Sequence, residues 1–312
     1  MKSLKELGIG ICLGGSLALT GCGQETVAPS LVELNCPEIQ GAEALLTREG
    51  VDLIVFGEIH GAKEPPQFVA DMICASLKTG QSTVLALEYP YGQQGDLDEY
   101  LNNADETLAA RILLSKKFWT REWQDGRTSQ AMFDLIKQIK SYYVLGYDVR
   151  LHAYQPWDIS TTEGYDKLSR SEQGQAYEKK MAKNLWSAVG DNKVIALVGN
   201  LHAKRGAYPY ESKSYDLMAK HLPIDAVVTV NVQHFGGTAW NCRGETPNMC
   251  KVYKSGASRG KDKKSSQIFR KNGEPIRLKA VHMHFENENG YDGVYNIVTF
   301  TSSSPAHTLI TD

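Results

Sequence analysis

Short apolar runs alternate with longer amphipathic segments along most of this 312-residue chain. Five of the runs are rich in Val, Ile and Leu, as strands buried on both faces of a sheet are. They cover residues 51–56, 83–87, 149–154, 194–198 and 226–232. The segments between them have helical patterning, over about 67–78, 94–116, 127–142, 171–189 and 212–221. This alternation predicts an α/β fold, with a mostly parallel central sheet and helices on both faces.

Two further apolar runs near the C-terminus, 278–285 and 293–300, are joined by the turn-forming sequence Glu286–Gly290. Their spacing predicts an antiparallel strand pair at the edge of the sheet. A basic loop insertion, rich in Ser and Gly, precedes them over about 251–277. We interpret it as a solvated loop, with a docking surface for anionic lipid headgroups as the alternative.

The N-terminus has the layout of a secretory signal, because Lys2 and Lys5 precede an apolar stretch that ends near Thr20. The sequence Leu19–Cys22 also resembles a bacterial lipobox, which implies cleavage after residue 21 and lipidation of Cys22. Gly23 after the cysteine favours an outer-membrane lipoprotein that faces the periplasm. An ordinary secretory signal is the alternative. We therefore expect a signal peptide over 1–21, a tether over 22–38 and a single α/β domain over 39–312.

Charge and cysteine usage agree with an envelope protein. Without residues 1–21 the chain has 32 basic and 35 acidic side chains, a formal charge of −3, which argues against nucleic acid as a partner. A small-molecule or peptide substrate, and a membrane reached through the lipid, are the expected partners. Four cysteines remain besides Cys22, and an even number in an oxidising compartment suggests disulfides. The favoured pairs are Cys36–Cys74 and Cys242–Cys250, and four free thiols are the alternative.

Two of the predicted strands end in the same pattern, Gly-x-x-His, at His60 and at His202. The carboxyl ends of parallel strands meet at one edge of a sheet, where ligands bind. Glu58 belongs to the first pattern, and Glu88 follows the strand between them in sequence. These four side chains are the predicted catalytic residues, since imidazole and carboxylate can act as base and orienter. His60, His202 and Glu88 are alternatively ligands of a divalent zinc, manganese or iron ion.

Further residues are candidates for a substrate pocket around this edge, and each also has a purely structural interpretation. The candidates are Glu64, Trp119, Arg121, Arg127, Tyr154 and His234. Aromatic and arginine side chains over 118–127 suit an apolar or anionic ligand, although a packed lid explains them equally well. His282 and His284 share a strand face that suits a metal, but a solvated edge is the simpler interpretation. No Gly-x-Ser-x-Gly, P-loop or Gly-x-Gly-x-x-Gly motif occurs, which removes the common serine hydrolase, nucleotide and dinucleotide classes.

The segments 56–64 and 85–88 together resemble the opening of the erythromycin esterase-like and ChaN-like superfamily, and 198–206 resembles its second histidine motif. The paired Gly-x-x-His is also similar to the TIKI/TraB group of metalloproteases. The resemblance implies His60 as general base, supported by Glu58 and Glu88, with His202 orienting the substrate or stabilising charge. A metal-dependent hydrolase follows from the TIKI-like relation. The resulting expectation is an envelope lipoprotein that hydrolyses an ester or amide, and the alternative is a ChaN-like lipoprotein that binds haem or iron without catalysis.

Overall fold

Within the described residues, seven strands form one sheet in the order β10-β11-β7-β1-β4-β2-β3. The computed structural model describes residues 32–256, 279–288 and 290–310, and of 284–288 only the backbone. Neighbouring strands are parallel except β10 and β11, which form an antiparallel pair at the edge. This arrangement confirms the predicted α/β class. The strands are β1 (Leu53–Glu58), β2 (Thr83–Pro90), β3 (Val149–Gln155), β4 (Lys193–Gly199), β7 (Val227–His234), β10 (Val281–Glu288) and β11 (Tyr291–Ile297).

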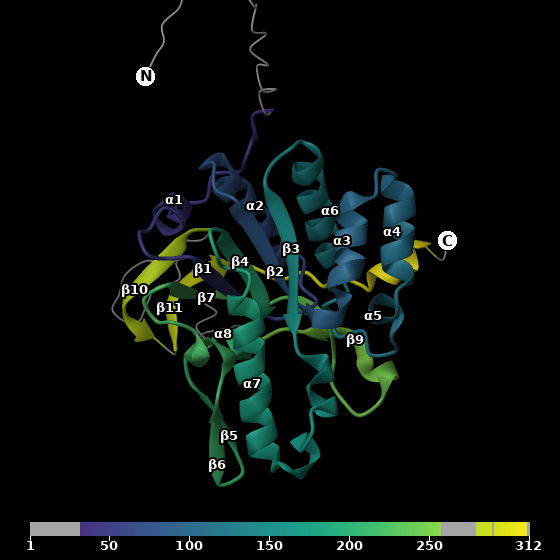
Figure 1. Cartoon of the computed structure of the whole chain (residues 1–312), viewed down its shortest axis with the longest axis vertical. Coiled ribbons are helices and arrows are strands. Elements are labelled where there is room, and N and C mark those ends of the chain that lie inside the picture. Colours follow the sequence, from purple (N-terminus) through teal and green to yellow (C-terminus); the bar gives the residue numbers. More distant parts are fainter. Residues whose placement is uncertain (1–31, 257–278, 289, 311–312) are drawn as a thin grey trace, which may run out of the picture. The chain divides into compact units, whose positions relative to one another are not determined.

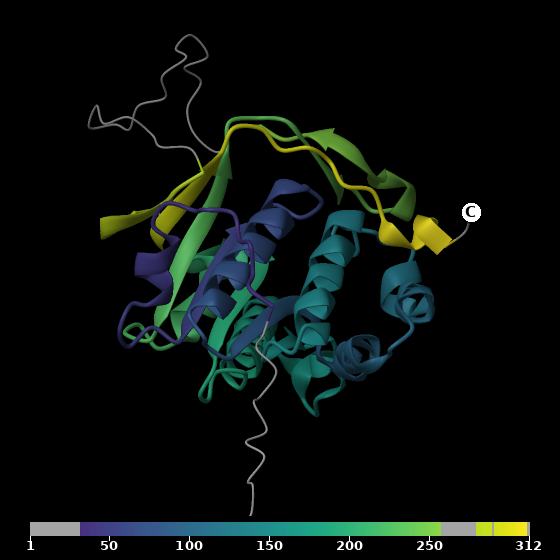
Figure 2. The ribbon, with the colours of Figure 1, turned by 90° about the horizontal axis from the view of Figure 1, so that it is seen from above.

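Both faces of the sheet are covered, because alternate side chains of β1 enter two different cores. Ile54 and Phe56 pack in the core that includes α2 (Glu64–Lys78) and α6 (Gln130–Val144), which lie side by side (Figure 2). Leu53 and Val55 pack in the core that includes α7 (Arg170–Trp186), labelled in Figure 1. The other helices are α1 (Ala42–Leu46), α3 (Gln94–Asn102), α4 (Glu106–Ser115), α5 (Lys117–Thr120) and α8 (Asn200–Ala203).

Two of the predicted helices differ from the structure. The segment 94–116 forms two helices instead of one, because the Asp105 side chain accepts a hydrogen bond from the Leu108 N–H, at 2.9 Å, and starts a new helix there. The prediction of a helix over 212–221 was wrong. Its first half is strand β6 (Lys213–Asp216), which pairs with β5 (Ala207–Tyr210), and its second half is a short 3₁₀ helix.

The predicted basic insertion begins with regular structure. Its first residues belong to β9 (Cys250–Lys254), which is antiparallel to β8 (Thr238–Cys242). The disulfide Cys242–Cys250 joins the two strands. The remainder of the insertion, from residue 257 to 277, lies outside the described residues.

The N-terminal end of the described chain is attached to the domain. Leu34 is buried in the α2 core, and the second predicted disulfide, Cys36–Cys74, joins residues 33–38, which we expected in the tether, to α2. Both predicted disulfides are thus present. The predicted signal peptide and Cys22 lie outside the described residues. In the part of the chain that the structure describes, no helix has the length and apolar character needed to cross a bilayer.

Candidate active site

Three neighbouring strands, β1, β4 and β2, end at the same edge of the sheet. Glu58 at the end of β1 is paired in register with Gly199 at the end of β4, so the two Gly-x-x-His patterns leave the sheet side by side. His60 follows β1 within two residues, and His202 lies on α8, which begins directly after Gly199. Glu88 lies on β2, the other neighbour of β4. The parallel register therefore brings together side chains that are up to 144 positions apart in sequence.

Each histidine is paired with its own glutamate. His60 Nδ1 lies 2.5 Å from Glu58 Oε1, and His202 Nδ1 lies 2.8 Å from Oε1 of Glu178 on α7. An ionised carboxylate only accepts hydrogen bonds, so in both pairs the ring Nδ1–H is the donor. Glu58 and Glu178 are each 3% exposed, which shields these contacts from water. Both rings are thereby fixed with Nε2 directed away from its glutamate partner.

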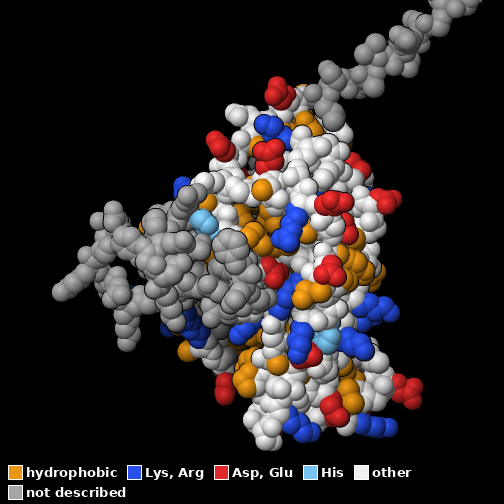
Figure 3. Space-filling model, turned by 90° about the vertical axis from the view of Figure 1, so that its left-hand side faces the viewer, with side chains coloured by type: hydrophobic (Ala, Val, Ile, Leu, Met, Phe, Trp, Pro, Cys, Tyr) orange, Lys and Arg blue, Asp and Glu red, His pale blue; other side chains and the backbone are white. Residues whose placement is uncertain are grey.

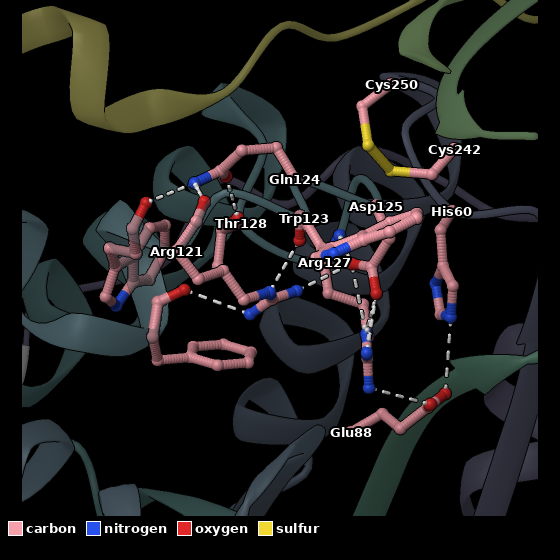
Figure 4. A network of polar contacts seen from close by, with 12 residues as sticks. His60, Glu88, Arg121, Trp123, Gln124, Asp125, Arg127, Thr128, Cys242 and Cys250 are labelled. Carbon is pink, nitrogen blue, oxygen red and sulfur yellow. Dashed lines mark hydrogen bonds and ion pairs between the residues drawn. A yellow bond between two sulfur atoms is a disulfide. The ribbon is translucent and has the colours of Figure 1, made fainter. Parts of the chain in front are cut away.

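Glu88 lies between the two rings. His60 Nε2 is 3.4 Å from Glu88 Oε2, whereas His202 Nε2 is 4.0 Å from Glu88 Oε1, beyond hydrogen-bonding distance. Oε2 also accepts a hydrogen bond from the Gly199 N–H at 2.8 Å. Figure 4 shows His60 and Arg127 both directed at the Glu88 carboxylate. Carboxylates and imidazoles therefore alternate across the site, in the order Glu58, His60, Glu88, His202 and Glu178.

Electrostatics make the two histidines different. Burial alone lowers the pKa of His60, but the charges of Glu88 and Glu58 outweigh it and raise the pKa to about 10. For His202, burial also lowers the pKa, and the hydrogen bond to Glu178 with the charge of Glu88 brings a net rise above 6.5. Burial raises the pKa of Glu88, yet His60, His202 and Arg127 together hold it well below its usual range. At neutral pH, Glu88 is therefore a carboxylate and His60 an imidazolium.

Both rings open into one cleft with a volume of about 350 Å³. The ring-bearing side chains are 23% exposed for His60 and 20% exposed for His202, so solvent and small ligands reach them. Glu88 lies beneath the rings and is only 5% exposed. The residues that line the cleft are Glu58, Ile59, His60, Asp125, Gly199, Asn200, Leu201, His202, Asn241 and Cys242. The disulfide Cys242–Cys250 thus places the β8–β9 hairpin in the wall beside His60 (Figure 4).

The sequence matches no protein-family model and no curated protein. The structure is similar to that of a His-to-Asn variant of the erythromycin esterase EreC in its open conformation. The TM-score is 0.58 at 12% identity, over 84% of this chain and 95% of that chain. The fold is erythromycin esterase-like. A succinoglycan biosynthesis protein is also similar, with a TM-score of 0.54 at 11% identity over 84% of this chain and 91% of that chain.

ChaN of Campylobacter jejuni, which was solved with cofacial haem, is less similar. The TM-score is 0.40 at 14% identity, over 69% of this chain and 91% of that chain. The erythromycin esterase-like fold suggested by the two histidine motifs is confirmed by the first two similarities, at sequence identities that show the fold alone.

The predicted pocket arginines lie beside the cleft in one ionic network. Arg127 contacts Glu88 Oε1 through Nη1 at 3.2 Å and Asp125 Oδ2 through Nη2 at 2.5 Å. Asp125 also accepts a hydrogen bond from Arg121 Nη2 at 2.7 Å. Burial alone raises the pKa of Asp125, but Arg127 and then Arg121 outweigh it and lower this pKa to about 2. The network is fully ionised at neutral pH.

The other four predicted pocket residues do not line the cleft. Trp119 is buried in the core of the α2 face, edge-on to Tyr89, and Tyr154 is buried and donates a hydrogen bond to the Leu197 carbonyl. Both aromatic side chains therefore support the erythromycin esterase-like fold around the site instead of facing a ligand.

Glu64 and His234 also have structural partners. Glu64 accepts hydrogen bonds from the Thr301 N–H, at 3.1 and 2.9 Å, and lines a separate groove. His234 is fully buried, stacks on Phe300 and shares a hydrogen bond with Ser255. His282 lies half-buried on the edge strand β10, and the side chain of His284 is outside the described residues.

Two site residues, Glu178 and Asp125, were missed by the sequence interpretation. Glu178 lies on a helix that reads as polar, yet it precedes Met181, Ala182 and Leu185 by three, four and seven positions. These three residues form the buried stripe of α7, so the periodicity places Glu178 on that stripe. A carboxylate on an apolar stripe was the available signal. For Asp125 the sequence contained only a weak signal, which was its position between two arginines in the segment 118–127.

The predicted metal ligands do not form a metal site in this arrangement. Oε1 of Glu88 already accepts from the cationic Arg127, and Oε2 accepts from the Gly199 N–H. Among the described residues, no group of three His, Cys, Asp or Glu side chains is arranged to hold a metal ion. The predicted haem alternative fits no better, because the cleft is small and its large apolar side chains are Ile59 and Leu201 alone.

Proposed function

We propose that this protein hydrolyses an ester or amide, with His202 and His60 as an acid–base pair. The observation that carries the proposal is the pair of Glu–His contacts that open into one cleft above a shared carboxylate. Two imidazoles that carboxylates hold in place at one cleft suit general acid–base catalysis, with His202 Nε2 open to the cleft and His60 Nε2 facing Glu88. The erythromycin esterase-like fold supports this reaction class by analogy only.

The contacts favour a specific division of roles. His60 lies near two carboxylates, at 2.5 and 3.4 Å, and so keeps its second proton at neutral pH. His202 has one close carboxylate partner and an Nε2 that is 4.0 Å from the other, so it loses its proton more readily. This assignment reverses the roles implied by the family resemblance, in which His60 is the base.

In the proposed reaction, His202 Nε2 accepts a proton from a water molecule as the water oxygen attacks the substrate carbonyl carbon. The imidazolium of His60 stabilises the negative charge that develops on the carbonyl oxygen. When the carbon–oxygen or carbon–nitrogen bond breaks, His60 donates its proton to the leaving group. A proton transfer from His202 to His60, by way of water, restores the starting state. Glu58 and Glu178 orient the rings throughout.

A panel of p-nitrophenyl esters and peptide p-nitroanilides tests this proposal on the purified mature protein. We expect hydrolysis that continues in the presence of a chelator and is lost in the His202→Asn variant. Absence of turnover across the whole panel contradicts the proposed function. Turnover that stops with the chelator and returns with a divalent ion contradicts the metal-independent mechanism.

We also propose that the protein acts in the cell envelope as a lipoprotein anchored through Cys22, without a nucleic-acid partner. The two disulfides support an oxidising compartment. On the face drawn in Figure 3, basic and acidic side chains are interspersed, unlike a nucleic-acid-binding surface. We expect the wild-type protein to be found in the membrane fraction and to be labelled by radioactive palmitate. The Cys22→Ser variant should not be labelled. Equal labelling of the two contradicts the anchor.

A further inference from the structure

Every guanidinium nitrogen of the two arginines beside the cleft has a partner within the protein. Arg127 directs Nε and Nη2 at Asp125 and Nη1 at Glu88. Arg121 donates from Nε to the Trp123 carbonyl, from Nη1 to the Phe118 carbonyl and from Nη2 to Asp125. Neither arginine lines the cleft, and both side chains are only 11% exposed. The network therefore acts on the site itself.

The loop that carries both arginines is fixed against the first histidine motif. Gly126 has a φ of 95°, and a Cβ at this position would lie 2.4 Å from the Gly61 backbone nitrogen. The Gln124 side chain donates hydrogen bonds to the Trp119 and Arg121 carbonyls, at 2.8 and 2.6 Å. The Trp240 indole donates to the Gln124 carbonyl at 2.8 Å. These contacts hold the Arg127 guanidinium at a set position relative to His60.

The two oxygens of Glu88 have different partners. Oε2 accepts from the Gly199 N–H at 2.8 Å and faces His60 Nε2 at 3.4 Å. Oε1 accepts from Arg127 at 3.2 Å and from the Gln155 amide at 3.4 Å, while His202 Nε2 is 4.0 Å away. The oxygen that would otherwise accept from His202 is thus occupied by a guanidinium.

We propose that Arg127 is a positioning residue that holds Oε1 of Glu88 away from His202, so that His202 Nε2 stays open to water in the cleft. The consequence for catalysis rests on the proposed hydrolytic function. The titratable groups that face His202 are Glu178 on α7, Glu88 on β2 and His60 after β1, with the Tyr177 ring 6.4 Å away. Without Arg127, the His202 ring turns onto Glu88 and acquires a second carboxylate partner, as His60 has.

The test compares wild type with Arg127→Gln by ¹⁵N NMR of the histidine rings over a pH titration. We expect the His202 Nε2 of the variant to stay protonated and hydrogen-bonded to a higher pH than in wild type, and the His60 signals to change little. With p-nitrophenyl acetate as the probe, we expect kcat to fall by about tenfold or more and KM to stay within about twofold. Arg127→Lys retains a charge near Oε1 and should recover part of kcat. Arg111→Gln, on the exposed surface of α4, is the control and should behave as wild type.

An unchanged His202 signal in Arg127→Gln overturns the proposal, as does a defect confined to KM, which would mean that Arg127 binds substrate. If Arg127→Gln does not fold, the His202 NMR signals and the kinetic constants of Arg127→Lys test the proposal instead. If wild type has no hydrolytic activity, the proposed function fails, and the NMR comparison still tests the positioning role of Arg127 by itself.

Discussion

At the scale of single residues, the same side-chain type has different chemistry in two nearly identical motifs. His60 and His202 both follow a buried strand and a glycine, and both donate through Nδ1 to a glutamate. They differ in the distance from Nε2 to Glu88, 3.4 Å against 4.0 Å. A difference of this size separates a close ion pair from a nitrogen that can accept from water.

Replacement of either histidine by asparagine should remove activity without unfolding the protein. We expect kcat/KM to fall by about 10²–10⁴-fold in His60→Asn and in His202→Asn, since each loses one proton-transfer group. Ester hydrolysis and far-UV circular dichroism measure the two effects. His307→Asn, on the C-terminal 3₁₀ helix, is the matched control and should behave as wild type. Full activity in His202→Asn contradicts its role as the base.

The pH dependence of kcat/KM follows from the two histidines. Activity requires neutral His202, so it should rise as the pH passes through the pKa of His202, which lies above 6.5. It also requires protonated His60, so it should fall as the pH passes through about 10. Initial rates from pH 5 to 11 check this bell-shaped profile. A rate that still rises beyond pH 10 instead identifies His60 as the base.

At the scale of elements, the site depends on the close approach of β4 to the end of β1. Gly199 ends β4, and a Cβ there would lie 3.2 Å from His60 Nε2 and 3.5 Å from Glu88 Oε2. Gly57 on β1 similarly makes room for α8, because a Cβ there would lie 2.8 Å from the Ala203 Cβ. The glycines of the two motifs thus serve packing around the site as well as chain direction.

Gly199→Ala should separate activity from stability. The added methyl group crowds the gap between His60 and Glu88, so we expect kcat to fall by about tenfold. The melting temperature should change by only a few degrees, because the displaced groups border an open cleft. Gly92→Ala is the control, since nothing lies within 4 Å of its Cβ position. A variant with wild-type kcat would show that the His60–Glu88 distance is not important.

At the scale of the whole molecule, two covalent links act at opposite ends of the fold. The bond Cys36–Cys74 attaches the N-terminal segment to α2 across 38 positions, and Cys242–Cys250 closes a hairpin of 8 positions. Loop-closure entropy makes the longer link worth more to stability. The shorter one lies in the cleft wall and matters more for the site.

Removal of each disulfide should therefore have a different effect. We expect the double substitution Cys36→Ser and Cys74→Ser to lower the free energy of unfolding by about 4 kcal/mol. The double substitution Cys242→Ser and Cys250→Ser should lower it by about 2.5 kcal/mol. Urea denaturation measures both. Only the second pair of substitutions should also alter ester hydrolysis, since Cys242 lines the cleft. An equal loss of activity in both would contradict this separation.

The sequence by itself determined the strands of the main sheet, their parallel pairing and the edge of the sheet at which the histidines meet. Short Val, Ile and Leu runs bounded by turn residues indicate strands buried on both faces, and a parallel sheet brings the carboxyl ends of its strands to one edge. His60, Glu88 and His202 could be brought together on that basis alone. Local turn chemistry likewise predicted the antiparallel pair at the sheet edge.

Only the tertiary structure decided which partners complete the site. Glu178 comes from a helix on the far side of His202, and Arg127 reaches Glu88 from 39 positions away. The strand β6 was mistaken for a helix because its pairing with β5 is set by cross-strand contacts, not by its own periodicity. Periodicity reports which face of an element is buried. The partner of a buried charge depends on side-chain positions within an ångström, and these are fixed only when the whole chain is packed.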